Sequence, residues 1–421
     1  MFARYLLPSL LTLACSSAMA GFSHIPAEGT ALPFSVLTTI DNVPIHHGGY
    51  GSAAAANPKN ENRFYAMTDR GPNADSPNKN EKIFPTPDYQ PTIGYFEVKN
   101  DGSIVLIKEI KFHTAEGKPI TGLPNSKGYG STGEIAVDMK GNKVGTDDNG
   151  IDSEGLVVMD DGSFWVSDEY GPHIAHFDAE GKQLERISPL GMKSNTGKLA
   201  LPAVLAKRRA NRGMEGLTIL PDGKTLVGIM QSTLFNPSKD EVKNKTLTRI
   251  VTLNLETGAS QQYLYQQDKA DYANSEILAI DDKHFLVDER DSEFDGSKKV
   301  YLVDISEATD VSGDVASETG LLVDGKTLEQ TEWDALEKAG IKPAQKKELL
   351  SLTKDVKGGY GHDKFEGMFF TDKSRTHLAV INDDDFAIAP VGDKKAGIKI
   401  KTLPNQKVDS NMLYVLPISL K

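Results

Sequence analysis

Four segments of this chain share one pattern that constrains its fold. Each begins with a glutamate, continues through a short apolar run, turns at residues such as Asp, Gly or Lys, and continues through a second apolar run. The glutamates are Glu154, Glu215, Glu276 and Glu366; the first three stand at equal intervals and the last follows a longer one. Equal spacing of one such unit indicates a repeat architecture, and the longer interval predicts an insertion.

A second pair of strands is predicted after these hairpins. Examples begin at Thr92, His173 and Arg249, and each contains a strand, a turn that ends in Gly and another strand. Four antiparallel strands per repeat, arranged around an axis, describe the blades of a β-propeller. The predicted fold class is therefore all-β, a β-propeller, and an irregular β-sandwich is the alternative.

The number of blades follows from the number of hairpins. Five hairpins are clear, because a more distant copy without the glutamate runs from His46 to Asn73. A sixth blade has room between Lys111 and Val144 or within the longest interval. We therefore expect five or six blades.

Two segments are predicted to be helical rather than extended. The first starts at Leu201 and ends before Gly213. The second, from Thr327 to Leu352, predicts a pair of short helices, the second of which opens at Pro343. A helical insertion is therefore expected within residues 306–360, on one face of the propeller.

The first twenty residues have the features of a secretory signal peptide. Arg4 precedes an apolar run from Tyr5 to about Ala14, and small residues end the segment at Ala20. This predicts cleavage after Ala20, a mature domain of residues 21–421 and a periplasmic or secreted location. The single cysteine, Cys15, lies inside the signal, and a lipoprotein attached there is the less favoured alternative. No later segment is apolar enough to predict a transmembrane helix.

Acidic residues outnumber basic ones in this chain. Asp and Glu total 59 against 47 Lys and Arg, which gives a formal net charge of −12. Such a balance argues against nucleic acid as a partner, because the phosphate backbone binds basic surfaces. It is compatible with the binding of cations.

The acidic residues are placed at both ends of the repeated hairpins. In an antiparallel hairpin the first residue of one strand lies beside the last residue of the next. This pairs Glu154 with Asp168 and Glu169. The same geometry pairs Glu276 with Asp288 and Glu289, Glu366 with Asp383, and Glu215 with Gln231. Rotation about the propeller axis then predicts a ring of carboxylates at one end of the central channel.

A ring of like charges favours a bound divalent cation, because crowded carboxylates raise one another's pKa. Calcium is the predicted ion, since it accepts six to eight oxygen ligands and the chain has neither a mature cysteine nor a zinc-type histidine pair. The predicted ligands are Glu154, Asp168, Glu215, Glu276, Asp288, Glu366 and Asp383. The alternative is that each glutamate only accepts hydrogen bonds from backbone amides between blades.

Basic residues lie near the same hairpin ends and predict an anionic substrate. Arg212 and Arg290 are predicted to orient the anion, and Arg70, His362 and Lys364 to bind the substrate. Salt bridges to the neighbouring acids are the alternative role. Motifs for a serine or cysteine nucleophile are missing from the sequence, so a hydrolase of this kind would use metal-activated water with Glu169 or Glu289 as the base.

Three ordered segments resemble a known family. They are "DSEGLVVMDDGSFWVSDEYGP" from Asp152, "LPAVLAKRRANRGMEGLTILPDG" from Leu201 and "KFEGMFF" from Lys364. Together they resemble the phytase-like family of exported bacterial proteins, described as having esterase-like activity of phytase. The resemblance implies a β-propeller and hydrolysis of phosphate or other esters. Its motif positions are Glu154, Asp168, Glu169, Arg212, Glu215 and Glu366.

These observations lead to one functional prediction with two alternatives. We predict an exported esterase or phosphoric-ester hydrolase that uses a calcium-bound water at the acidic end of the channel. The scattered basic residues favour a small anionic ester over phytate. The alternatives are a calcium-dependent lactonase-like hydrolase and a non-catalytic propeller that binds a ligand or partner.

Overall fold

The computed structural model of the protein describes residues 21–192, 194–392 and 395–420. Within these ranges the chain is built almost entirely from short β-strands, with few and short helices. The all-β prediction is therefore confirmed. The predicted signal peptide, including Cys15, lies outside the described residues. None of the described helices combines the length and apolar character that crossing a membrane requires.

The described residues form five four-stranded antiparallel sheets that follow one another along the chain. The first contains β4 (Ala53–Ala56), β5 (Arg63–Met67), β8 (Thr92–Val98) and β9 (Ile104–Lys111). The second contains β11 (Ser153–Val158), β12 (Phe164–Asp168), β13 (Ile174–Phe177) and β14 (Gln183–Ile187). The third contains β15 (Met214–Ile219), β16 (Thr225–Met230), β17 (Leu247–Asn254) and β18 (Ser260–Gln266). The fourth contains β19 (Ile277–Ala279), β20 (His284–Arg290), β21 (Lys298–Asp304) and β24 (Gln345–Ser351). The fifth contains β25 (Gly367–Phe370), β26 (His377–Ile381), β29 (Met412–Pro417) and β1 (Thr30–Ala31).

The first strands of successive sheets lie against one another. β4 contacts β11, β11 contacts β15, β15 contacts β19, and β25 returns to β4. All five of these strands line one cavity of about 400 Å³, whose wall includes Ala54, Leu156, Leu217, Ile277 and Phe369. Sheets whose first strands surround a common channel have a propeller-like arrangement.

The two ends of the chain meet in the fifth sheet. β1, near the amino terminus, is its outermost strand and pairs antiparallel with β29, so that Thr30 lies opposite Leu413. The amino-terminal segment, which continues into the first sheet, is thereby held to the last sheet by backbone hydrogen bonds.

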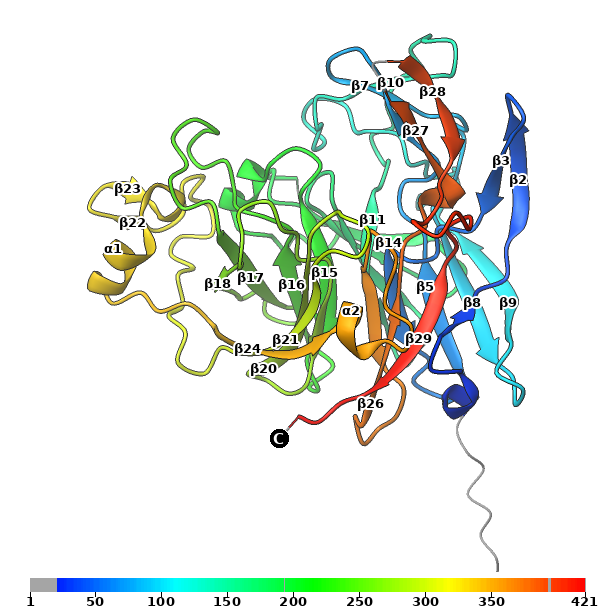
Figure 1. Ribbon diagram of the computed structural model, residues 1–421. Helices are drawn as coiled ribbons and strands as arrows, with labels where there is room; N and C mark the ends of the chain where they lie inside the picture. Colours follow the sequence, from blue (N-terminus) through cyan, green and yellow to red (C-terminus); the bar gives the residue numbers. More distant parts are fainter. Residues whose placement is uncertain (1–20, 193, 393–394, 421) are drawn as a thin grey trace, which may run out of the picture.

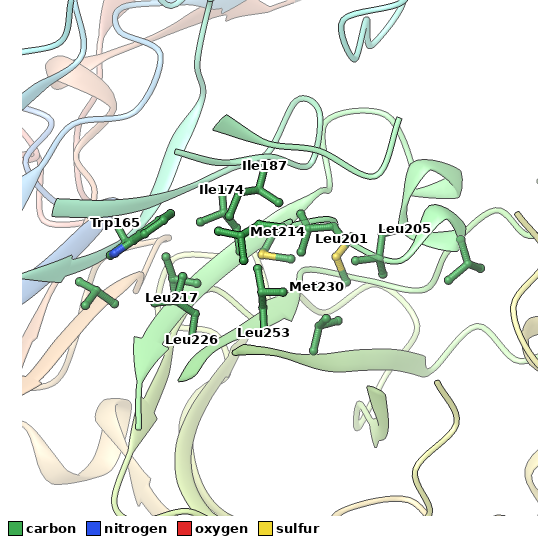
Figure 2. Close-up of a cluster of buried hydrophobic side chains, with 14 of the residues drawn as sticks. Trp165, Ile174, Ile187, Leu201, Leu205, Met214, Leu217, Leu226, Met230 and Leu253 are labelled. Carbon is green, nitrogen blue, oxygen red and sulfur yellow. The ribbon is translucent and has the colours of Figure 1, made fainter. Parts of the chain in front are cut away.

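The sheets pack face to face through apolar side chains on both sides of their strands. Every residue of β12 is buried, including Trp165 and Val166. Figure 2 shows the cluster between the second and third sheets, where Trp165 and Ile174 from one sheet pack against Met214 and Leu253 from the other. Burial on both faces explains why these strands are almost continuously apolar in sequence.

Smaller elements between the strands gather near one end of the sheets. They are the hairpin of β2 (Ser35–Ile40) and β3 (Val43–His47), the sheet of β6 (Ala74–Asp75), β7 (Glu81–Ile83) and β10 (Ile135–Val137), and the hairpin of β27 (Ile388–Gly392) and β28 (Lys395–Ile400). β28 contacts both β3 and β6, and the group lies at the top of Figure 1. We call these three units the cap.

Neither region considered for a sixth blade holds another four-stranded sheet among its described residues. The strand between Lys111 and Val144 is β10, which pairs in parallel with β7 in the cap. The longest interval contains a two-stranded sheet of β22 (Leu322–Val323) and β23 (Lys326–Thr327).

The helical predictions are only partly correct. The residues after Leu201 form a short 3₁₀ helix, η2 (Ala203–Lys207), and the insertion contains η3 (Leu328–Gln330) and α1 (Trp333–Lys338). The prediction of a helix that begins at Pro343 is wrong, because the chain there forms β24, which pairs with β21. A single helical turn, α2 (Leu352–Asp355), follows β24. Hydrogen bonding to a neighbouring strand has overridden local helix propensity.

Candidate functional site

A cavity of about 440 Å³ lies at the cap end of the channel, and charged side chains dominate its wall. Most of these side chains lie at or next to strand ends. The strands β11, β15 and β25 begin at the cavity, and the strands β5, β12 and β20 end at it. Its carboxylates are Asp69, Asp152, Glu154, Glu169, Glu215, Glu366 and Asp385. Its cations are Arg70, Lys82, Arg209, Arg212, Arg290 and Lys364. We call it the charged cavity.

Irregularities in the first strands turn two of the repeated glutamates toward this cavity. In β11 the pairing register shifts between Ser153, opposite Asp168, and Gly155, opposite Ser167, so that Glu154 has no partner across the strand. A similar shift between Met214 and Leu217 in β15 contains Glu215. A β-bulge re-aims a side chain in this way.

The glycine after each of these glutamates allows neighbouring sheets to approach closely. A Cβ atom on Gly155 would lie 2.5 Å from the carbonyl oxygen of Glu215. A Cβ atom on Gly216 would lie 2.4 Å from the backbone nitrogen of Ile277. Both distances are too short for any other residue, so the Glu-Gly pairs are required where the first strands meet.

The repeated glutamate that is not followed by glycine behaves differently. Glu276 precedes Ile277, and the described register of β19 contains no shift. Its carboxylate accepts hydrogen bonds from the backbone N–H of Ile277 at 2.9 Å and of Leu217 at 3.2 Å. Glu276 lines the apolar cavity and is not part of the charged-cavity wall.

Three carboxylates in the charged cavity are close enough to share a cation. One oxygen from each of Asp69, Asp152 and Glu154 lies within 4.8 Å of the other two, and all three residues are buried. Two oxygens that bind one calcium ion at about 2.4 Å lie at most about 5 Å apart. The spacing and the all-oxygen donor set therefore fit a hard divalent cation such as calcium.

Burial and mutual repulsion make this group costly to ionise without a cation. Burial raises the pKa of Asp69, and the charges of Asp383 and Asp152 raise it further. Burial also raises the pKa of Glu154, with added repulsion from Glu215 and Asp152. A positive charge between such carboxylates relieves both effects.

Glu169 and Glu215 are two further buried carboxyl groups of the cavity wall. Burial raises the pKa of Glu169, and the charge of Asp152 adds to this effect. Burial, followed by the charges of Glu169 and Glu366, raises the pKa of Glu215. Glu169 accepts a hydrogen bond from Gln231 at 3.2 Å, whereas the carboxyl group of Glu215 has no hydrogen-bond or ion-pair partner within the described parts of the chain. These two groups are suited to holding and exchanging a proton.

Several cations of the cavity are already neutralised by carboxylates. Arg290 donates to Glu366. Lys364 binds Asp383 at 2.7 Å and Asp385 at 2.6 Å. Arg70 makes comparable contacts, with Glu134 at 3.0 Å and Asp152 at 3.5 Å.

Arg209 and Arg212 differ, because neither forms an ion pair with a carboxylate of the described chain. They lie at the ends of a tight turn, in which Arg212 N–H donates to the Arg209 carbonyl at 3.0 Å. Asn211 adopts a positive φ of 55° there and accepts a hydrogen bond from Arg70 at 3.0 Å. Burial lowers the pKa of Arg212, and the guanidinium groups of Arg209 and Arg290 lower it further. This local excess of positive charge is available to an anionic ligand.

The structure does not bring six of the residues expected at the site into the charged-cavity wall. Asp168 accepts backbone hydrogen bonds from Asp152, Tyr170 and Gly171 and pairs with His173. Asp288 accepts from Ser275 and Glu276 at 2.6 Å each. These two aspartates and Glu276 tie backbone segments together.

The side chains of Glu289 and His362 also bind residues outside the charged-cavity wall. Glu289 binds Tyr265 and Lys346, both at 2.8 Å. His362 contacts Asp409 at 2.7 Å and Tyr414 at 2.9 Å. Asp383, a predicted ligand, lies next to the wall and is held by Lys364.

Sequence reasoning missed five charged residues of the wall, namely Asp69, Lys82, Asp152, Arg209 and Asp385. For two of them the sequence contains a pattern that could have indicated the site. Asp152 stands two residues before Glu154, and Asp69 in "TDRGPN" corresponds to Asp168 in "SDEYGP". Lys82 comes from the cap strand β7, and Asp385 from the short helix η4 (Asp385–Ala387), which directly precedes the cap strand β27; only the tertiary structure brings these two elements together at the cavity.

Fold and site together define a propeller-like, all-β protein with a charged cavity at one end of its channel. The chain belongs to the phytase-like family, described as "Esterase-like activity of phytase", whose model matches residues 45–386. The family predicted from the sequence is thus confirmed.

Similarity to individual proteins is more distant. A protein described as an "Uncharacterized secreted protein" from Arthroderma benhamiae is 30% identical over 191 residues, which cover 39% of this chain and 37% of that protein. The match therefore spans little more than a third of the relative.

Three solved structures are similar at low identity. A protein from Lactobacillus plantarum has 10% identity and a TM-score of 0.35, with 88% of each chain covered. Regucalcin from Agrobacterium tumefaciens, described as a calcium-binding protein, has 10% identity and a TM-score of 0.32 over 92% of this chain and 96% of its own. Virginiamycin B lyase from Staphylococcus aureus has 12% identity and a TM-score of 0.29 over 92% and 89%.

Proposed function

We propose that this protein is an exported, calcium-dependent hydrolase of small esters that carry one anionic group, such as phosphate monoesters. In this proposal its five four-stranded sheets are the five blades of a propeller, and the charged cavity is the active site. The family description, esterase-like activity of phytase, supports ester hydrolysis.

The observation that carries the proposal is the shared position of Asp69, Asp152 and Glu154. Their oxygens converge within the span that one calcium ion requires, and among the described residues Arg70 is the one cation that forms an ion pair with any of the three. When bound there, calcium would stabilise negative charge on the ester and favour ionisation of water. The charged carboxylates Glu366 and Asp385 are paired with Arg290 and Lys364 and would form the remaining wall.

The residues around this cluster would bind the substrate and move protons. Arg212, with Arg209 beside it, would bind the anionic group through charge-assisted hydrogen bonds. Glu169, in its ionised form, would accept the proton of the attacking water. Glu215, in its protonated form, would donate a proton to the departing alcohol oxygen, so that one water is consumed and one alcohol and one acid are released. Two buried carboxyl groups with raised pKa values are suited to these complementary roles in proton transfer.

The proposal is tested by ester turnover before and after removal of calcium. Purified mature protein would be assayed with 4-nitrophenyl phosphate, 4-nitrophenyl acetate and a γ-lactone, then treated with a chelator and resupplied with calcium. We expect hydrolysis of the phosphate ester, its loss on chelation and its recovery with calcium. Unchanged turnover in chelator would contradict the calcium mechanism, and turnover of the lactone alone would support a lactonase instead.

A pair of variants tests the assignment of the base. Glu169→Gln should lower kcat about 10²-fold or more, which is the usual contribution of general acid–base catalysis. Glu289→Gln is the matched control, because Glu289 does not line the charged cavity and binds Tyr265 and Lys346. Equal losses in both variants, at a temperature where both are folded, would exclude Glu169 as the base.

A further inference from the structure

A second cavity adjoins the charged one and has a different character. It has a volume of about 320 Å³ and shares three wall residues with the charged cavity: Asn73, Lys82 and Asp385. A ligand bound near these three residues would reach into both spaces. The two cavities therefore form one elongated site.

The second cavity has an apolar wall that the charged cavity lacks. Its apolar residues include Phe294 from the loop after β20, Ala74 from β6, and Ile388 and Pro390 from β27. Ile388 and Ala74 are buried, whereas Phe294 is 37% exposed. An exposed aromatic ring at the wall of a cavity gains contact area when an apolar group binds beside it.

The loop that contains Phe294 is stabilised by hydrogen bonds between its two ends. Asp291 accepts hydrogen bonds from the backbone of Ser297 at 2.8 Å and from the Lys298 ammonium group at 2.7 Å. Lys298 also donates to the Glu293 carbonyl at 2.8 Å. Within this loop Ser292 lines the charged cavity and Phe294 lines the second cavity. The loop thus holds one residue in each half of the elongated site.

The charges of the second cavity are largely balanced. Lys82 binds Asp75 at 2.8 Å, and Lys401 binds Asp363 at 2.7 Å and Asp385 at 2.6 Å. Among the described residues of this wall, Lys399 is the one cation without a carboxylate partner, and it is exposed. A substrate with many phosphate groups would therefore find few free cations here.

We propose that the second cavity is the subsite for the alcohol part of the ester and that it selects a compact apolar group, preferably an aromatic ring. This inference rests on the proposed function, because it places the anionic group at Arg212 and lets the alcohol part extend past the shared residues Asn73 and Asp385 into the second cavity. The substrate class is then an aryl or short alkyl monoester with one anionic group. Phe294 is its specificity-determining residue.

Binding of phenylphosphonate and methylphosphonate tests the subsite separately from turnover. Both compounds mimic the anionic group of a phosphate monoester, resist hydrolysis and differ in the apolar part. Calorimetric titration in the presence of calcium should show phenylphosphonate binding at least about five-fold more tightly, as one aromatic contact provides. Phe294→Ala should remove most of this preference and leave methylphosphonate affinity within about two-fold, whereas Phe294→Trp should retain the preference.

Phe34→Ala is the matched control, because Phe34 is also exposed and lines neither cavity. It should leave both affinities unchanged. Equal affinities in the unmodified protein, no binding of either compound, or an undiminished preference in Phe294→Ala would overturn the subsite. A Phe294-dependent preference in a protein that hydrolyses no ester would instead refute the proposed function and retain the subsite as a binding site for aromatic anions.

Discussion

Arg290 donates a hydrogen bond to Glu366 across the charged cavity, although one residue ends β20 and the other precedes β25. Each side chain is only 6% exposed, so this ion pair links the fourth and fifth sheets in a nearly dry environment. The guanidinium of Arg212, in contrast, donates among the described residues only to the carbonyl of Tyr272, at 3.3 Å. Two arginines with the same expected role therefore have different partners, one a carboxylate and the other a neutral carbonyl.

Arg290→Gln should destabilise the fold. The substitution leaves the buried Glu366 carboxylate without its cation, and breaking a buried pair in this way costs about 3 kcal/mol of unfolding free energy. Urea unfolding measures the loss. Arg63→Gln is the control, because Arg63 and Glu97 form a more exposed pair whose loss should have a much smaller effect. Similar losses in both variants would contradict the structural role of Arg290.

Arg212→Gln should weaken substrate binding without comparable destabilisation. Its guanidinium has no carboxylate partner among the residues described, so we expect KM for 4-nitrophenyl phosphate to rise about ten-fold, as for a lost charge-assisted hydrogen bond. KM for the uncharged 4-nitrophenyl acetate should stay within two-fold. An equal rise for both substrates would indicate a general disturbance of the cavity rather than lost anion binding.

The repeated hairpins were predictable because their apolar runs have a simple physical cause. Strands such as β12 are buried on both faces between neighbouring sheets, and this requirement recurs in every repeat. β24 was not predictable in the same way. Five of its seven residues are exposed or half-buried, so the pairing with β21, rather than an apolar pattern, determines its conformation.

The candidate site was predictable only in part because equivalent sequence positions have different local backbones. Glu154 and Glu215 lie in register shifts that turn them to the charged cavity, whereas Glu276 binds backbone amides. The sequence contains a trace of this difference, since Gly155 and Gly216 follow the first two glutamates and Ile277 follows the third. Its meaning depends on the distance between neighbouring sheets, which the sequence does not specify.

Asp152→Asn should impair calcium binding. It removes one of three converging carboxylates, and we expect the calcium affinity to fall about ten-fold or more, because a neutral amide oxygen is a weaker ligand for this ion. Calorimetric titration with calcium measures the change. Glu276→Gln is the control, since Glu276 accepts backbone hydrogen bonds and does not line the charged cavity. An equal loss of calcium affinity in Glu276→Gln and Asp152→Asn would contradict the assignment of Asp69, Asp152 and Glu154 as the calcium ligands.

Glu215→Gln should change how stability depends on pH in calcium-free protein. Burial, with repulsion from Glu169 and Glu366, raises the pKa of Glu215 well above its ordinary value of 4.5. The native state therefore holds this proton more tightly than the unfolded state, so its contribution to stability is complete below pH 4.5 and is lost as pH rises through the raised pKa. Glutamine cannot ionise, so the variant should be more stable than the original protein at pH 8 and of similar stability at pH 4.

Thermal and urea unfolding at the two pH values, with chelator present, measure this difference. Glu337→Gln is the control, because Glu337 is an exposed residue of α1 and lies outside the charged cavity. It should show no pH-dependent gain. A Glu215→Gln variant that is less stable than the original protein at pH 8 would mean that the ionised carboxylate is stabilised in the fold.

Gly216→Ala should be strongly destabilising even though it adds only a methyl group. The new Cβ atom would lie 2.4 Å from the nitrogen of Ile277 and 2.6 Å from backbone carbons of Glu276, and neither can move without separating β15 from β19. We expect a loss of about 2–4 kcal/mol in urea unfolding, in the upper range for overpacking because the contact is with backbone. Gly361→Ala is the control, because a Cβ atom there would meet only Asp295, at 3.7 Å, and its loss should stay below about 1 kcal/mol. If Gly216→Ala were equally mild, the first strands would have room to separate, and the Glu-Gly pair would not be required by their packing.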